Sequence, residues 1–203
     1  MKTRHLPLLL LLALFVPWRA TAQETVTIGS GTSTNGYAPL FGNYKSSYDQ
    51  MIYTASQMQN AGLDAAGSIT KIAFNSSSAN TYARKVKIYM GHTSKTSFSS
   101  NTDFIAYNDL TLVYDYSATG NGLWSITTGW NEFELDTPFD YDGESNLVIA
   151  VHCGKIDNYN NSSFYYTAVT SYQVVYAYSD SNDPIPESFN PNTSPTKMSS
   201  LAS

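Results

Sequence analysis

Apolar and polar residues alternate along most of the chain after residue 23, and helical periodicity is nearly absent. Between residues 84 and 90, Val86, Ile88 and Met90 are separated by lysine or tyrosine, as in a strand with one buried face. Clusters of Gly, Asn and Asp interrupt the pattern every ten to fifteen residues, which is typical of antiparallel sheets. We therefore expect ten strands, at about 24–29, 48–58, 68–75, 82–91, 110–116, 123–128, 130–136, 146–153, 163–168 and 172–178.

Residues 146–151 are apolar at almost every position, which predicts a central strand that is covered on both faces. The turn at 140–144 contains Gly143 and should join two antiparallel neighbours. These features predict an all-β fold, an antiparallel two-sheet β-sandwich of jelly-roll-like type, in a single domain over residues 23–180. Residues 181–203 are rich in Pro, Ser and Asn, and we expect an irregular tail that contributes little to the core.

The first 22 residues have the pattern of a cleavable signal peptide. Lys2 and Arg4 precede an apolar run from Leu6 to Val16, and Ala20 and Ala22 are small residues where a signal peptidase cuts. The run is about half the ~20 residues that a bilayer span needs. We expect a secreted or cell-surface protein with no membrane anchor.

Charge and cysteine content narrow the function further. The net charge is −5, and loss of residues 1–22 removes Lys2, Arg4 and Arg19 but no acidic residue, so the mature domain carries −8. The remaining basic cluster at 84–87 should be the solvated face of a strand, so nucleic acid is a poor partner. Cys153 is the sole cysteine, which excludes an internal disulfide.

Two segments carry a resemblance to a known family. The stretch 86–93, followed by 97–99 and 109–114, and the stretch from Gly129 to Val151 resemble a β-sandwich module of exported surface proteins of Bacteroidetes-type bacteria. Such modules occur beside fibronectin-like, adhesin and peptidase domains. The resemblance extends over most of residues 26–180, and it implies fold and location without any catalytic residues.

The chain departs from that family after residue 180. Such modules usually close with one more apolar strand, and their parent proteins often carry a C-terminal sorting domain. Neither is recognisable before Ser203. Two interpretations remain open, a minimal and freely secreted form or a truncated gene product.

Three carboxylates on one strand face give the sharpest indication of an enzyme. Glu132, Glu134 and Asp136 alternate with Phe133 and Leu135. Alternate strand residues lie about 6.5–7 Å apart, near the carboxylate spacings of glycoside hydrolases. The competing interpretation is a solvated strand face.

The adjacent pair His152 and Cys153 is a weaker indication of catalysis. Neighbouring strand residues face opposite sides of a sheet, so the two side chains cannot form a dyad. We expect Cys153 to be a buried, inert thiol.

Oxygen-rich loops raise the question of calcium. Asp140 and Asp142 precede Gly143 as in the start of a calcium loop, but the distal Glu of an EF-hand is missing. Asp157 lies in another such loop. We expect no cofactor apart from structural calcium at some pair of these loops, and the alternative is that Asn and Asp are there as turn formers.

Aromatic residues supply the remaining candidates. The chain contains 16 Tyr, 9 Phe and 3 Trp, and Tyr combines an apolar face with a hydroxyl group. We select Trp124, Tyr159 and Tyr165 as ligand-binding residues, and we expect Trp130 and Tyr141 to be core or corner residues. Cross-strand packing is the competing explanation for most of the rings.

Together these observations favour a secreted, non-catalytic recognition or adhesion module that binds glycan or protein surfaces through exposed aromatic rings. The alternatives are a glycosidase-type hydrolase that uses Glu132 and Glu134, and a structural spacer in a longer surface protein. The sequence leaves the ligand and the oligomeric state open.

The signal-peptide interpretation can be checked directly. Mass spectrometry of protein collected outside the producing cell should show an N-terminus at Gln23 or Glu24, because cleavage follows Ala22. Exported protein that retains residues 1–22 would contradict this interpretation.

Overall fold

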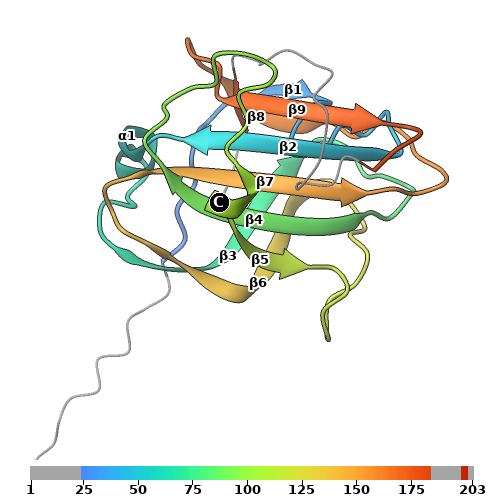
Figure 1. The fold of residues 1–203 in the computed structure, drawn as a ribbon, viewed down its shortest axis with the longest axis horizontal. Helices are drawn as coiled ribbons and strands as arrows, with labels where there is room; N and C mark the ends of the chain where they lie inside the picture. The colour runs from blue at the N-terminus through green and yellow to red at the C-terminus, as the bar shows by residue number, and fades with distance from the viewer. Residues whose placement is uncertain (1–23, 184–197, 201–203) are drawn as a thin grey trace, which may run out of the picture.

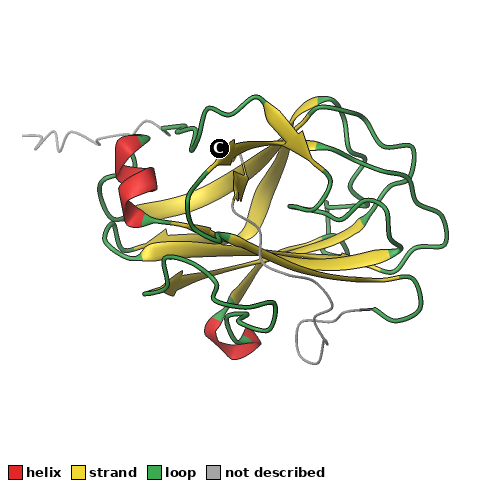
Figure 2. Cartoon of the chain, turned by 90° about the horizontal axis from the view of Figure 1, so that it is seen from above, coloured by secondary structure: helices red, strands yellow, loops and turns green. Residues whose placement is uncertain are grey.

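A computed structural model describes residues 24–183 and 198–200, which form two antiparallel sheets packed face to face (Figures 1 and 2). The expected all-β, two-sheet sandwich is confirmed. Sheet A has the order β1-β8-β3-β6, with β10 also pairing with β8, and sheet B has the order β5-β4-β7-β2-β9. The strands of sheet A are β1 Ser33–Asn35, β3 Gly67–Ser76, β6 Gly129–Tyr141, β8 Phe164–Ala168 and β10 Met198–Ser200. Those of sheet B are β2 Ser46–Tyr53, β4 Lys85–Thr93, β5 Thr111–Asp115, β7 Asn146–Gly154 and β9 Val174–Ser179.

The pairing follows the pattern of a long hairpin that is folded over and wound. β2 pairs with β9, β3 meets β8 at Ser76 and Phe164, and β4 pairs with β7. Early strands therefore pair with late ones, which gives the sandwich its jelly-roll-like character. Every strand pair is antiparallel.

Strand β7 is buried on both faces, as its unbroken apolar sequence predicts. Leu147, Ile149 and Val151 belong to the main core between the sheets. Val148 and Ala150, on the other face, contact residues of the segment 94–110, which crosses the outside of sheet B. We call this segment the covering loop.

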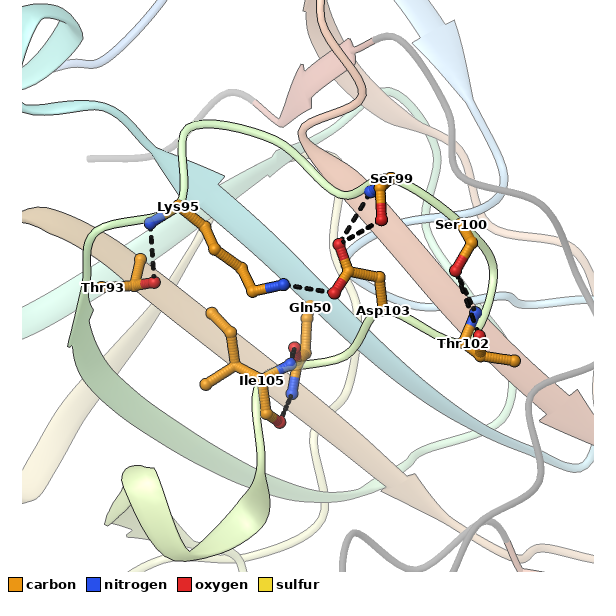
Figure 3. A network of polar contacts seen from close by, with 8 residues as sticks. All are labelled: Gln50, Thr93, Lys95, Ser99, Ser100, Thr102, Asp103 and Ile105. Carbon is orange, nitrogen blue, oxygen red and sulfur yellow. Dashed lines mark hydrogen bonds and ion pairs between the residues drawn. The ribbon is translucent and has the colours of Figure 1, made fainter.

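One buried amide attaches the covering loop to sheet B. Gln50 donates from Nε2 to the Ile105 carbonyl at 2.9 Å and accepts from the Ile105 N–H at 2.7 Å. Figure 3 shows this pair beside the contact of Lys95 with Asp103, whose carboxylate also accepts from the Ser99 backbone N–H and side-chain hydroxyl. Phe98 is buried and donates its N–H to the Tyr172 carbonyl. The covering loop thereby closes the outer face of sheet B over β2 and β7.

The main core between the sheets is rich in aromatic rings. Phe133 on β6 makes edge-on contacts with Tyr114 and Trp124 at centroid distances of 5.1 and 5.0 Å, and with Phe74 at 6.2 Å. Such T-shaped pairs are a favourable aromatic geometry. The sandwich depends on this packing, because its one cysteine is unpaired.

Two expected strands are wrong. At 24–29 there is only a single bridge residue, Ile28, and at 123–128 only the bridge between Trp124 and Arg84. The second segment turns inward to bury Trp124 and Ile126 instead of extending a ladder.

The strand expected at 48–58 ends early, at Tyr53. Thr54 caps the short helix α1, Ala55–Asn60, in a capping box with Gln57. Local hydrogen bonding therefore decides this segment. A 3-10 helix, Tyr107–Asp109, lies in the covering loop on the outside of sheet B (Figure 2).

The turn after β6 has the expected conformation but a different role. Gly143 has φ of +80°, and a Cβ there would lie 2.5 Å from the Ala66 backbone nitrogen. The turn does not join neighbours in one sheet, because β6 belongs to sheet A and β7 to sheet B. That expectation is wrong, and the turn instead connects the two layers.

The segment expected to be an irregular tail contains a strand. β10 pairs with β8 over Met198–Ser200, on the side of β8 opposite to β1, since Tyr166 has a partner in both. β10 also lies against β2 and β9 of the other sheet. The scarcity of apolar residues after residue 180 does not prevent a strand there, because β10 pairs with β8 through its backbone. Residues 184–197 and the expected signal peptide lie outside the described residues.

Removing β10 should cost stability. A chain that ends at Asp183 leaves Tyr166–Ala168 without the three-residue ladder of β10. At about 1 kcal/mol for each backbone hydrogen bond, the free energy of unfolding should fall by roughly 1–3 kcal/mol. Urea denaturation of the two chains measures the difference, and a chain that lacks only residues 201–203 is the control. Equal midpoints would mean that β10 adds nothing.

Candidate functional site

Sheet A leaves its outer face open to solvent along β6, whereas the middle of sheet B is covered. Along β6 the side chains alternate between solvent and core. The exposed residues are Trp130, Glu132, Glu134 and Asp136, and the buried ones are Asn131, Phe133 and Leu135. The alternation expected at 130–136 is confirmed. This strand therefore presents one aromatic ring and three carboxylates on the outer surface.

The register of sheet A places further side chains beside this row. Asn75 of β3 pairs with Trp130, Ala73 with Glu132, and Lys71 with Glu134. Tyr165 of β8 lies one residue from the pair of Ser76 with Phe164, so it is next to Asn75 on the same face. Neighbouring strands are about 4.8 Å apart, which puts the Tyr165 and Trp130 backbones roughly 10 Å apart. We call this surface the Trp130 face; it comprises Lys71, Asn75, Trp130, Glu132, Glu134 and Tyr165.

Trp130 is the most unusual residue of this face. Its side chain is 40% exposed, and within the described residues it makes no ring contact. Trp124, by comparison, is 7% exposed, packs on Phe133 and donates from Nε1 to Asn131 Oδ1 at 3.2 Å. We therefore take this exposed ring as the candidate contact point of the face.

The burial of these two tryptophans is the reverse of what sequence reasoning expected. Trp124 belongs to the core, so it is not one of the exposed rings through which binding is expected. Trp130 is exposed, so its assignment to the core is wrong. Its parity was the missed signal, since Trp130 lies two residues before Glu132 on the polar side of the strand. Tyr141 is a buried corner residue as expected, and its hydroxyl donates to the Ser145 carbonyl.

The electrostatics of the Trp130 face centre on one ion pair. Lys71 Nζ lies 3.0 Å from Glu132 Oε2, and this hydrogen bond is the largest cause of the raised Lys71 pKa. Both side chains are well exposed, so the pair adds little to stability. The ion pair engages Lys71, which is the one cation among the residues of this face.

The strand carboxylates differ in their surroundings. Glu132 and Glu134 lie on the open surface of β6. Asp136 accepts hydrogen bonds from the Asp115 N–H and from the Asn121 side chain, in the loop after β5. Asp136 therefore helps to hold the edges of the two sheets together.

Tyr159 and Tyr165 are separated by the fold. Tyr165 belongs to the Trp130 face and is half-buried. Tyr159 is 37% exposed and lies near Tyr44, whose pKa it affects electrostatically. The two selected tyrosines therefore belong to different surfaces.

A second group of aromatic rings surrounds the edge strand β9. Phe41 makes edge-on contacts with four tyrosines, and the rings of Tyr44 and Tyr178 stack at 3.9 Å. Hydrogen bonding to Tyr178 is the main cause of the raised Tyr44 pKa, and burial is the main cause of the Tyr176 pKa of about 12. Because these rings cover one another, the group closes the β9 edge of the sandwich. Its members are Tyr37, Phe41, Tyr44, Tyr176 and Tyr178.

The three aspartates selected for calcium are not brought together. Asp142 accepts from the backbone N–H groups of Glu144 and Ser145 and from the Ser145 hydroxyl, which together lower its pKa to about 2. Asp140 and Asp142 lie before β7 and Asp157 after it, at opposite ends of a nine-residue strand. Among residues 24–183 and 198–200, no group of three His, Cys, Asp or Glu side chains is placed to hold a metal ion. Structural calcium at a pair of these loops stays a prediction.

His152 and Cys153 face opposite sides of sheet B, as expected. Cys153 is in the main core, and burial raises the pKa of its thiol far above the ordinary range. His152 Nε2 lies 2.7 Å from Asp183 Oδ1. His152 is therefore not placed to act as a base on the thiol.

The interior holds an unusual carboxyl group and an unusual guanidinium group. Asp49 on β2 is fully buried, and Ser47 Oγ donates to its Oδ2 at 3.0 Å. Its Oδ1 makes no hydrogen bond within the described residues. Arg84, expected on a solvated face, is instead fully buried and donates to the Gly42 and Tyr44 carbonyls. That expectation is wrong for Arg84, whereas Lys85 is exposed.

Comparisons with protein-family models, with curated proteins and with solved structures return no match. Within the described residues, no helix is long and apolar enough to cross a bilayer.

Asp49 should make stability depend on pH. Desolvation raises the pKa of this carboxyl well above its ordinary 3.8, and the Ser47 hydrogen bond only partly opposes the rise. Because the pKa of Asp49 is higher in the folded than in the unfolded state, its protonated carboxyl contributes fully to the free energy of unfolding below about pH 3.8. This contribution is lost as pH rises through the folded-state pKa.

Asp49→Asn keeps the shape of the protonated acid, and its amide does not ionise, so the variant loses no stability at this position as pH rises. The free energy of unfolding of the variant should therefore exceed that of the wild type increasingly as pH rises from about 4 toward 7, by at most about 1.4 kcal/mol per pH unit. Urea titrations at several pH values measure the difference. Asp64→Asn, at an exposed site, is the control, and parallel curves for Asp49→Asn would contradict the prediction.

Proposed function

We propose that this chain is a secreted, non-catalytic recognition module that binds glycan surfaces through the Trp130 face. The observation that carries the proposal is the exposed Trp130 ring on the open face of sheet A. Aromatic rings stack on the apolar faces of sugars, and the tryptophan ring offers the largest area for such contact.

The neighbours of Trp130 suit an extended, hydroxyl-rich ligand. Tyr165 provides a second ring from a backbone position about 10 Å from that of Trp130, which favours a chain of sugars over a single sugar. Asn75 lies between the two rings and can both donate and accept hydrogen bonds. Glu132 and Glu134 add acceptors along one side. Polar groups beside stacked rings are the usual composition of a site that orients its ligand.

The hydrolase alternative receives less support from the same residues. Glu132 is engaged by Lys71, and both glutamates lie on an exposed strand face rather than in a cleft. The spacer alternative leaves the exposure of Trp130 without an explanation. A protein ligand would contact the same rings. A glycan array probed with residues 23–203 is therefore the first experiment.

Trp130→Ala should weaken binding to any glycan that the array identifies. Loss of a stacked anchor costs roughly 1–3 kcal/mol, which corresponds to about a five- to 150-fold rise in Kd. Tyr165→Ala should act in the same direction, and Trp130→Phe should retain part of the affinity. Isothermal titration gives Kd, and thermal unfolding checks that each variant is folded.

Leu112→Ala is the matched control, because Leu112 is also 40% exposed but lies on β5 of sheet B. Equal losses for Leu112→Ala and Trp130→Ala would remove the support for this site. Binding that survives Trp130→Ala and Tyr165→Ala together would locate recognition elsewhere.

A further inference from the structure

The charges of the Trp130 face restrict its ligand. Glu132 and Glu134 are the carboxylates of the face, and Asp136 continues their row along β6 beyond it. The facing residues 71–75 of β3 supply one cation, Lys71. That cation is already bonded to Glu132 at 3.0 Å. The face therefore has a negative excess and no unpaired Lys or Arg among these outward residues.

Acidic sugars need the opposite arrangement. Carboxylate, sulfate and phosphate groups are bound through charge-assisted hydrogen bonds from Arg or Lys. An acidic ligand stacked on Trp130 would instead place its negative charge beside Glu132, two residues away on the same strand face. At about 7 Å along the strand, this repulsion acts within the Debye length of about 10 Å at 0.1 M salt.

The same carboxylates suit uncharged sugars. An ionised carboxylate only accepts hydrogen bonds, and its natural partners are hydroxyl and amide N–H groups. Glu134 pairs in register with Lys71 but forms no hydrogen bond with it, because Lys71 Nζ is directed to Glu132. Glu134 thus has lone pairs available for a ligand.

We infer that the ligand of the Trp130 face is an uncharged glycan, and that Glu132 and Glu134 exclude acidic glycans. This inference rests on the proposed function and adds its ligand class. Specificity of this kind comes from repulsion of the wrong partner as much as from attraction of the right one.

The test uses pairs of glycans that share a backbone and differ in charge. Suitable pairs are hydroxyethyl and carboxymethyl cellulose, methyl-esterified and free polygalacturonan, and desialylated and sialylated mucin glycans. The wild-type protein should bind the neutral member of a pair at least about tenfold more tightly at low salt. The difference should shrink between about 0.01 M and 1 M salt, as the Debye length falls from about 30 to 3 Å.

Glu132→Gln combined with Glu134→Gln should reduce severalfold the ratio of the Kd values for the acidic and the neutral glycan of a pair. The reduction should come mainly from tighter binding of the acidic glycan. The double variant removes two negative charges and also releases Lys71 from its ion pair. Asp64→Asn combined with Asp109→Asn changes the net charge equally at exposed sites outside the Trp130 face, and it should leave the difference unchanged.

Two results would overturn the inference alone. One is an equal reduction of the Kd ratio by both double variants, which would mean that the overall charge of the protein excludes acidic glycans. The other is an acidic glycan that binds as tightly as its neutral partner while remaining sensitive to Trp130→Ala; the proposed function would then stand with another ligand class. If no glycan binds, or if binding ignores Trp130→Ala, the proposed function fails and the inference fails with it.

Discussion

The structure depends on the burial of β7 from both sides. Its inward residues need sheet A, and its outward residues need a second cover, because a strand with two apolar faces is unstable wherever one of them meets water. The covering loop meets this need, and Gln50 holds it by pairing with both backbone groups of Ile105. The loop covers sheet B around β2 and β7, whereas the outer face of sheet A stays open along β6. The position of the candidate site thus follows from how the central strand is covered.

Much of this organisation could be predicted from the sequence, because it depends on local alternation. The two faces of β6 and β4, the central position of β7 and the burial of Cys153 all follow from a period of two. Segments without clear alternation were misassigned. Residues 123–128 have strand-like composition but contribute one bridge. Residues 55–60 form a helix because Thr54 and Gln57 form a capping box and because Ala, Gln and Met favour helices.

The candidate site was harder to predict, because it is assembled from three strands that are distant in sequence. Asn75, Trp130 and Tyr165 become neighbours only through the register of β3 with β6 and β8, and no local pattern specifies that register. Composition identified aromatic recognition as a function class but could not separate the buried Trp124 from the exposed Trp130. The parity of Trp130 with Glu132 could have separated them, since both must face the same side of β6.

The winding of the strands has a consequence for how the chain acquires its fold. β1, near residue 34, pairs with β8, near residue 165, and β2 pairs with β7 and β9. These early strands have no partner until the late strands are available. Neither sheet can be completed from residues close together in sequence, so the entropy of closing long loops is lost before most native pairs form. We therefore expect slow folding, with the early strands unpaired during synthesis. A chain of this kind stays unfolded for longer than one built from local hairpins, because β1 to β4 lack part of their partners until residues 146–179 have been synthesised.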